Sequence, residues 1–229
     1  GNYYVFDALY PVTPLLENLI VLLSGFEYSP LFDILLETPG AASGSAGQEF
    51  KGFVRPGSQP VYSVTALLNS KLPSTVTSGA QGWSLGILHD GGLLAVEAVT
   101  TEGTDGGGLI RGGFERHEIV DNATGQGIVS GVVLSFSKAV ALPAQGRSSL
   151  LRIEYRLLAD TSVPGASIQG QVQYKDKLRG EGQPVNNVVT YLGESNRPLV
   201  QRGLTLDLTV GDPPRQPFVR GDANNDSRV

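Results

Sequence analysis

Short runs in which apolar and polar side chains alternate are the feature that most restricts how this chain can fold. The clearest run covers residues 149–158 (SLLRIEYRLL), where the charged residues Arg152, Glu154 and Arg156 lie between apolar ones. Successive side chains of an extended chain point to opposite faces, so this run has one apolar and one charged face. The pattern predicts a strand with one buried face and one face in water, which is typical of antiparallel sheets.

Seven further runs have the same character and predict further strands. They are residues 61–68, 82–88, 93–99, 127–136, 167–174, 188–192 and 204–210. The chain also holds 30 Gly and 14 Pro, the residues on which turns depend, and residues 101–113 form a glycine-dense loop. Turn signals spaced roughly 8–12 residues apart predict an all-β sandwich or barrel. No helical pattern longer than two turns follows residue 30.

The chain divides into an extended N-terminal segment and linker (1–57), the sandwich (58–212) and a tail (213–229). Residues 39–49 are small and polar, which is typical of a loop or linker. Pro213 and Pro214 are expected to end the sandwich, because proline cannot continue a hydrogen-bonded ladder. The sequence leaves open whether residues 27–57 pack into the sandwich.

Composition argues against several kinds of partner. There are 17 Lys and Arg against 22 Asp and Glu, which gives a net charge of −5. This balance argues against nucleic acid and against anionic membrane surfaces, which both require clustered basic residues. The absence of cysteine excludes disulfides and thiolate metal sites. No run reaches the ~18 apolar residues of a membrane span.

The end of the tail matches part of a calcium-binding loop. Asp222, Asn224 and Asp226 occupy alternate positions, and Arg228 would offer its backbone carbonyl oxygen. Ser227 stands where such loops normally have glycine, and the sequence stops before the bidentate acid that completes the loop. We therefore expect this half-loop to bind calcium weakly on its own.

Two parts of the sequence resemble modules of secreted bacterial proteins. The tail sequence FVRGDANNDSRV resembles the opening of a dockerin-type repeat, and QGWSLGILHDGGLLAVEAV and GIVSGVVLSFS resemble strands of cohesin-like domains. The resemblance covers residues 58–229. It implies a jelly-roll-like β-sandwich, an extracellular bacterial setting, and binding through surfaces rather than catalysis. A cohesin is expected to hold a dockerin as its partner.

One N-glycosylation sequence lies in a predicted polar loop. Asn122, Ala123 and Thr124 form it, so Asn122 is a candidate glycosylation site. A second such sequence begins at Asn225 and overlaps the calcium half-loop. The tripeptide also occurs often by chance.

No catalytic residue is predicted. His89 and His117 are the only histidines, and each has acidic neighbours but no third ligand at a diagnostic spacing, so surface turn positions explain them better. Ser130 does not match the nucleophile-elbow pattern. A secreted hydrolase would need a carboxylate pair or a catalytic triad in a cleft, and nothing in the sequence favours one.

Four aromatic residues are candidate platforms for sugar rings. They are Tyr62, Trp83, Tyr155 and Tyr174. Trp83 alternates with apolar residues on one strand face, so core packing is the better explanation for it.

The first ten residues (GNYYVFDALY) favour an extended chain and precede any predicted domain. We expect Tyr3, Tyr4, Val5, Phe6 and Leu9 to form an assembly surface by donating a strand to a neighbouring copy. Such head-to-tail contacts propagate into filaments when the rotation between copies does not close.

The sequence therefore predicts a non-catalytic extracellular structural subunit that self-assembles head to tail. The alternative is a cohesin-like or carbohydrate-binding adhesion module, which would recognise a dockerin or a glycan through the surface of its sandwich.

Overall fold

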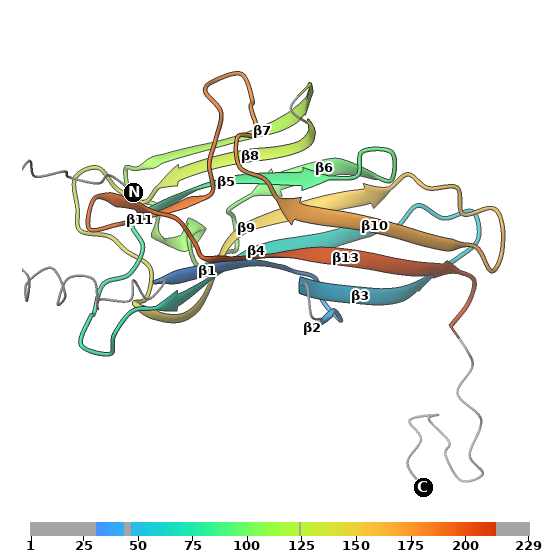
Figure 1. Ribbon diagram of the computed structural model, residues 1–229, viewed down its shortest axis with the longest axis horizontal. Coiled ribbons are helices and arrows are strands. Elements are labelled where there is room, and N and C mark those ends of the chain that lie inside the picture. The colour runs from blue at the N-terminus through green and yellow to red at the C-terminus, as the bar shows by residue number, and fades with distance from the viewer. Residues whose placement is uncertain (1–30, 44–46, 124, 214–229) are drawn as a thin grey trace, which may run out of the picture. The chain divides into compact units, whose positions relative to one another are not determined.

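The computed structural model describes residues 31–43, 47–123 and 125–213, which form a jelly-roll-like β-sandwich (Figure 1). One sheet contains, in order, β6 (Leu94–Thr100), β9 (Gln145–Leu157), β4 (Val61–Lys71) and β1 (Phe32–Glu37). The other contains, in order, β7 (Phe114–Asn122), β8 (Gly125–Val133), β5 (Gly82–His89), β10 (Ser167–Tyr174), β13 (Val200–Val210), β3 (Gly47–Val54) and β2 (Ala42–Ser43). Two short strands, β11 (Val188–Tyr191) and β12 (Glu194–Asn196), also belong to this sheet, and β11 pairs with the start of β5.

Strand β13 connects the two sheets. Its first residues pair with β1, and residues 203–210 pair with β3, and both of these pairings are parallel. The other strand pairs are antiparallel. The predicted all-β sandwich is thus confirmed, with two parallel pairings that the sequence did not indicate.

The core lies between the sheets, and alternation along the strands decides which side chains reach it. The apolar side chains of the alternating run in β9 are buried, as predicted. On the outer face of the same sheet Arg152 pairs with Glu154 (3.5 Å) and Arg156 with Glu97 (2.8 Å). Trp83 is only 3% exposed and packs in the core, which confirms the interpretation of its strand.

The sandwich begins earlier than the predicted boundary between residues 57 and 58. Strand β1 pairs with β4 along its whole length, and β3 pairs with β13 over eight residue positions. The small polar stretch 39–49 is therefore the connection from β1 through β2 into β3, not a linker before the sandwich. The stretch resembles a linker in composition, but Pro39 and Gly40 form the turn after β1, and the φ of +83° at Gly40 is one that favours glycine.

Strand β7 is absent from the sequence prediction. Its sequence, FERHEIVDN, carries charges on both faces and lacks the apolar alternation that marks the other strands. As an edge strand it pairs only with β8 and buries little apolar surface, so its sequence need not alternate. His117 lies in the middle of β7 and His89 ends β5, so the expectation that both occupy surface turns was wrong.

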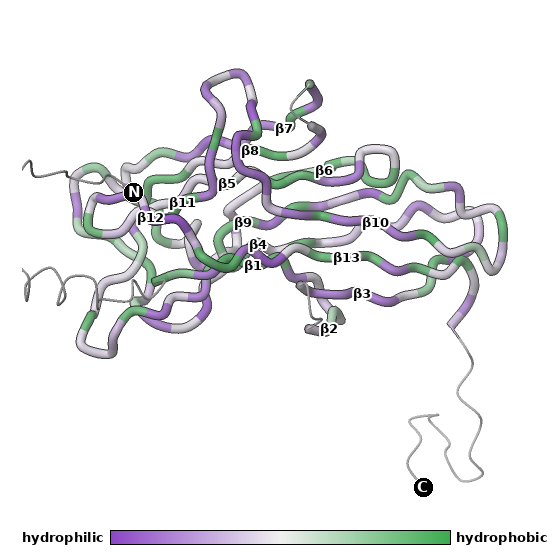
Figure 2. The backbone as a smooth tube through the Cα atoms, viewed as in Figure 1, coloured by the Kyte–Doolittle hydropathy of each residue, from purple (hydrophilic) through white to green (hydrophobic). Residues whose placement is uncertain are grey.

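Residues 175–187 connect β10 to β11 and cross the outer face of β5, β8 and β7 (Figure 1); we call this segment the strap. Figure 2 shows most of it as hydrophilic. Its one fully buried apolar side chain, Leu178, packs against Val120 and Val129 on the outer side of the sheet. The strap therefore forms a small second core on the face opposite the main one.

Asn187 fixes the strap where β5 changes partners. Strand β5 pairs with β11 at residues 82–84 and with β10 at residues 87–89, so Gly86 has no strand beside it on this side, although β8 pairs with it on the other. The Asn187 Oδ1 accepts from the Gly86 N–H (2.8 Å), and the Lys175 N–H donates to the Gly86 carbonyl (2.8 Å). The Asn187 Nδ2 also donates to Asp176 (3.1 Å) and Gln201 (3.2 Å). A single fully buried side chain thus satisfies the backbone at this break.

Candidate protein-binding surface

The outer edge of β7 is open. Within the described residues β7 pairs with β8 along all nine positions without a bulge, and no backbone hydrogen bond joins residues 114–122 to any other strand or loop. In an antiparallel edge strand every second residue directs its N–H and C=O groups away from the sheet. Such an edge is a template for pairing with another chain.

Among the other edges of the described sandwich, β3 is open at residues 50–54, beyond the two residues that β2 covers, which is a shorter stretch than the nine residues of β7. The remaining edges are less suited to pairing. Strand β6 has a bulge between Val96 and Ala98, and the extra residue there is Glu97. Strands β2 and β12 have only two and three residues. Bulges, inserted charges and short length are the usual protections of an edge, whereas β7 is long and regular.

Two large apolar side chains on β7 are exposed. Phe114 is 46% and Ile119 is 62% exposed. An odd separation in sequence places them on opposite faces of the strand. Phe114 lies opposite Val133 on the outer face, and Ile119 lies opposite the core residue Ile128 on the inner face. An approaching partner would therefore meet an apolar anchor on each side of the free edge.

An apolar groove lies beside Phe114, between the outer face of β7 and β8 and the strap. Its volume is ≈ 190 Å³, and Val129, Gly131 and Val185 contribute to its lining. Gly131 faces Arg116 across the strand pair and carries no side chain, which leaves the space open. A groove of this volume would hold one apolar side chain of a partner.

Ion pairs hold the strap at the rim of this groove. The Arg116 side chain pairs with Glu118 on its own strand and with Glu181 of the strap (Nη2 to Oε2, 3.0 Å). The Glu181 backbone N–H also donates to Glu118 Oε2 (2.6 Å). The surface thus has apolar anchors with a charged rim, the arrangement found in protein interfaces.

Three hydrogen-bonded side chains on the inner side of β7 have the residue types of a catalytic triad, but the serine among them is not accessible to a substrate. His117 Nε2 donates to Glu115 Oε1 (2.7 Å), and Ser130 Oγ donates to His117 Nδ1 (3.1 Å). Burial raises the pKa of Glu115, but hydrogen bonds from Thr101 and His117 outweigh it and hold the pKa below its ordinary value. Ser130 is fully buried, so its hydroxyl cannot reach a substrate. These hydrogen bonds orient the His117 ring and give the buried Ser130 hydroxyl a partner.

His89 is a second histidine with a structural position. It is 9% exposed, and its ring packs edge-on against Tyr155 at 5.2 Å between centroids. Burial lowers the pKa of His89, and the nearby carboxylates of Asp90 and Asp121 offset this only in part. Within the described residues its buried Nδ1 has no hydrogen-bond partner.

The lowered pKa of His89 predicts a loss of stability in mild acid. As pH falls through the ordinary value of 6.5, the unfolded chain takes up a proton that the folded chain still excludes, so unfolding becomes more favourable. We expect the free energy of unfolding to fall less between pH 7.5 and 5 in His89→Gln than in the parent protein, as measured by urea denaturation. If the free energy of unfolding falls equally with pH in the two proteins, His89 does not cause the loss of stability in mild acid.

Several predicted site residues lie outside the described residues. They are Tyr3, Tyr4, Val5, Phe6 and Leu9 of the assembly segment, and Asp222, Asn224, Asp226 and Arg228 of the calcium half-loop. Among the described residues no group of three or more His, Cys, Asp or Glu side chains could hold a metal ion. Both expectations therefore stay predictions.

The glycosylation candidate Asn122 ends β7 at the turn into β8, not in a loop. Its side chain is exposed, and its Nδ2 donates to the Arg179 carbonyl of the strap (2.7 Å). A sugar on Asn122 would therefore sit beside the strap and compete with this contact.

None of the four candidate aromatic residues offers an exposed platform for a sugar ring. Trp83 and Tyr155 are buried in the core. Tyr62 is half-buried against Phe50, and the Tyr174 hydroxyl donates to the Leu35 carbonyl (3.1 Å). In the part of the chain that the structure describes, no helix is both long and apolar enough to cross a membrane.

Comparison with solved structures shows a cohesin-like fold. The chain is similar to a protein of a type I cohesin–dockerin complex from Clostridium thermocellum, with 12% identity, 80% of this chain and 96% of that chain covered, and a TM-score of 0.52. Another similar structure is the seventh ScaB type I cohesin of Pseudobacteroides cellulosolvens, with 12% identity, 82% and 97% coverage, and a TM-score of 0.41. No family model and no curated protein sequence matches the chain.

Proposed function

We propose that this chain is a non-catalytic binding module of the bacterial cell exterior, which holds a protein partner against β7 and the strap. The observation that carries the proposal is the open edge of β7, with Phe114 and Ile119 exposed on its two faces. A similar fold is found in a protein crystallised as a cohesin–dockerin complex, which makes a dockerin the first partner to test.

Titration calorimetry against a panel of type I dockerin modules, with calcium present, tests the proposal. We expect at least one dockerin to bind with a dissociation constant on the order of 1 μM or below. Failure of every dockerin to bind would reject this class of partner. Binding that does not respond to substitutions on β7 would reject the surface.

Self-assembly is a second candidate, and the same open edge favours it, because strand donation requires an acceptor edge. We expect deletion of residues 1–11 to leave a folded monomer, since all described strands lie C-terminal to the deletion. Size-exclusion chromatography and electron microscopy would compare it with the full chain. Assembly that is unchanged by the deletion, or a full chain that stays monomeric, would reject strand donation.

A further inference from the structure

A second hollow lies on the outer face of the larger sheet, at the place where β5 ends. Strand β10 pairs with β5 only at residues 172–174, so residues 167–171 have no strand beside them on that side. The missing strand leaves a groove of ≈ 380 Å³ beside these residues. It is lined chiefly by Leu88, Asp90, Gln169, Gln171, Gln173 and Thr205.

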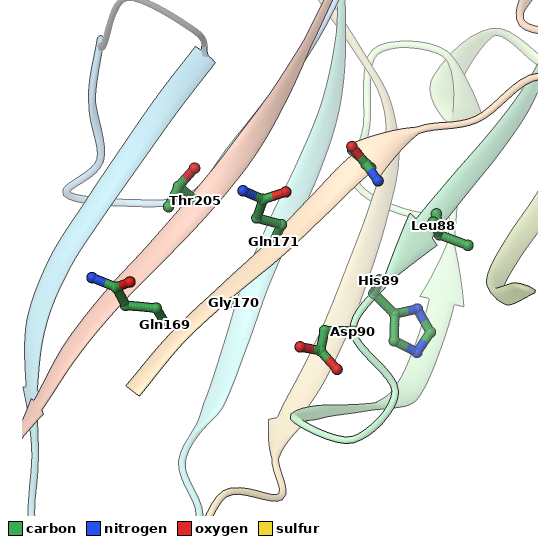
Figure 3. Close-up of a pocket in the computed structure, with 8 residues that line it drawn as sticks. Leu88, His89, Asp90, Gln169, Gly170, Gln171 and Thr205 are labelled. Carbon is green, nitrogen blue, oxygen red and sulfur yellow. The ribbon is translucent and has the colours of Figure 1, made fainter. Parts of the chain in front are cut away.

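The three glutamines form a row along one face of β10. Alternation along the strand turns Gln169, Gln171 and Gln173 outward, about 6.7 Å apart. Figure 3 shows Gln169 and Gln171 on the same side of β10, with Thr205 of β13 beside them and Asp90 at the far wall. The row therefore runs along the length of the groove.

These carboxamides have no partners in the fold. Gln169 lies directly opposite Asp207 and Gln171 opposite Thr205 on β13, yet within the described residues none of the three side chains makes a hydrogen bond. The outer face of the other sheet differs, because its charged side chains pair with one another. Each carboxamide offers two donors and one acceptor oxygen, so the groove presents a row of unused groups of both kinds.

The chemistry of the lining selects one class of ligand. No lysine or arginine lines the groove, so an anion would find no countercharge. Asp90 is the single carboxylate, which is too few for a hard cation that takes six or more oxygen ligands. An apolar ligand would desolvate the carboxamides without replacing their hydrogen bonds to water. Neutral hydroxyl groups both donate and accept, and so match the row.

We propose that this groove binds a neutral saccharide. Its hydroxyl groups hydrogen-bond to Gln169, Gln171 and Gln173, and one carbon-bearing face of the sugar packs on Leu88. No Phe, Tyr or Trp lines the groove, and the ring of His89, which also lines it, is buried against Tyr155. The affinity is therefore modest, with a dissociation constant on the order of 1 mM. The site is separate from β7 and does not depend on the proposed protein partner.

Nuclear magnetic resonance of the labelled protein tests the proposal, with cellopentaose, xylopentaose, mannopentaose and laminaripentaose as probes up to 20 mM. We expect at least one probe to shift the side-chain amide signals of the three glutamines in a saturable way. Gln171→Ala should weaken that binding at least fivefold. The matched control is Gln145→Ala, an exposed glutamine at the start of β9, which should bind like the parent protein.

Three results would overturn the saccharide site. They are no shift with any of the four probes, shifts that survive Gln171→Ala, and shifts that map to β7 and the strap instead. Each result leaves the dockerin titration unaffected, because that titration reads the β7 surface. Unchanged melting temperatures of both glutamine variants would show that any loss of binding is local.

Discussion

Replacing Ile119 with aspartate is expected to weaken binding of the protein partner at least tenfold. Ile119 is 62% exposed in the free protein, and its side chain lies next to the open edge of β7. Covering such a side chain contributes on the order of 1.5–3 kcal/mol, and an aspartate there would be desolvated without a countercharge. Phe114→Asp, on the other face of the strand, should have an effect of the same order.

Val163→Asp is the matched control for this prediction. Val163 is 59% exposed, almost as much as Ile119, but it lies in the connection between β9 and β10. We expect Val163→Asp to bind the partner like the parent protein, and all three variants to melt within a few degrees of it. If calorimetry finds an equal loss of affinity for the partner in Ile119→Asp and Val163→Asp, a partner surface on β7 is contradicted.

Replacing Asn187 with alanine is expected to destabilise the fold by about 3 kcal/mol. The substitution leaves the buried Gly86 N–H without its acceptor, and removes the donor that Asp176 and Gln201 share. Each unsatisfied buried group typically costs about 1–3 kcal/mol. Because Asn187 anchors the strap, the strap amides should also exchange with solvent faster than in the parent protein.

The neighbouring residue Asn186 provides the control for this substitution. The buried Oδ1 of Asn186 has no hydrogen-bond partner among the described residues, so Asn186→Ala should be neutral or slightly stabilising. Urea denaturation of both variants compares the two free energies of unfolding. Equal losses for Asn186→Ala and Asn187→Ala would show that the network around Gly86 is not what holds the strap.

The sequence predicts the strands whose side chains alternate, because each of them packs one face on the core. Strands β9 and β10 lie close to the predicted ranges 149–158 and 167–174 for this reason. The alternation identifies the Gln169 to Gln173 row as the outer face of a strand. It gives no sign that these carboxamides lack partners, since that depends on β13 and on the end of β5.

The candidate protein-binding surface could not be predicted from local patterns. Strand β7 is charged on both faces, and the ion pair from Arg116 to Glu181 joins residues 65 positions apart in the chain. Asn187 is likewise one polar residue in a loop sequence, and its role depends on the change of partners along β5. The one signal of this surface in the sequence was the pair of large apolar residues Phe114 and Ile119 within a charged segment, since a solvated loop would not be expected to contain them.

Hydrogen–deuterium exchange of the chain alone and with a dockerin that binds it in the titration tests the central claim most directly. If the partner docks on the open edge, amides of β7 and of the strap should exchange more slowly in the complex, while those of β6 and β9 stay unchanged. Protection confined to the sheet of β4, β9 and β6, with β7 exchanging as in the free protein, would contradict the account.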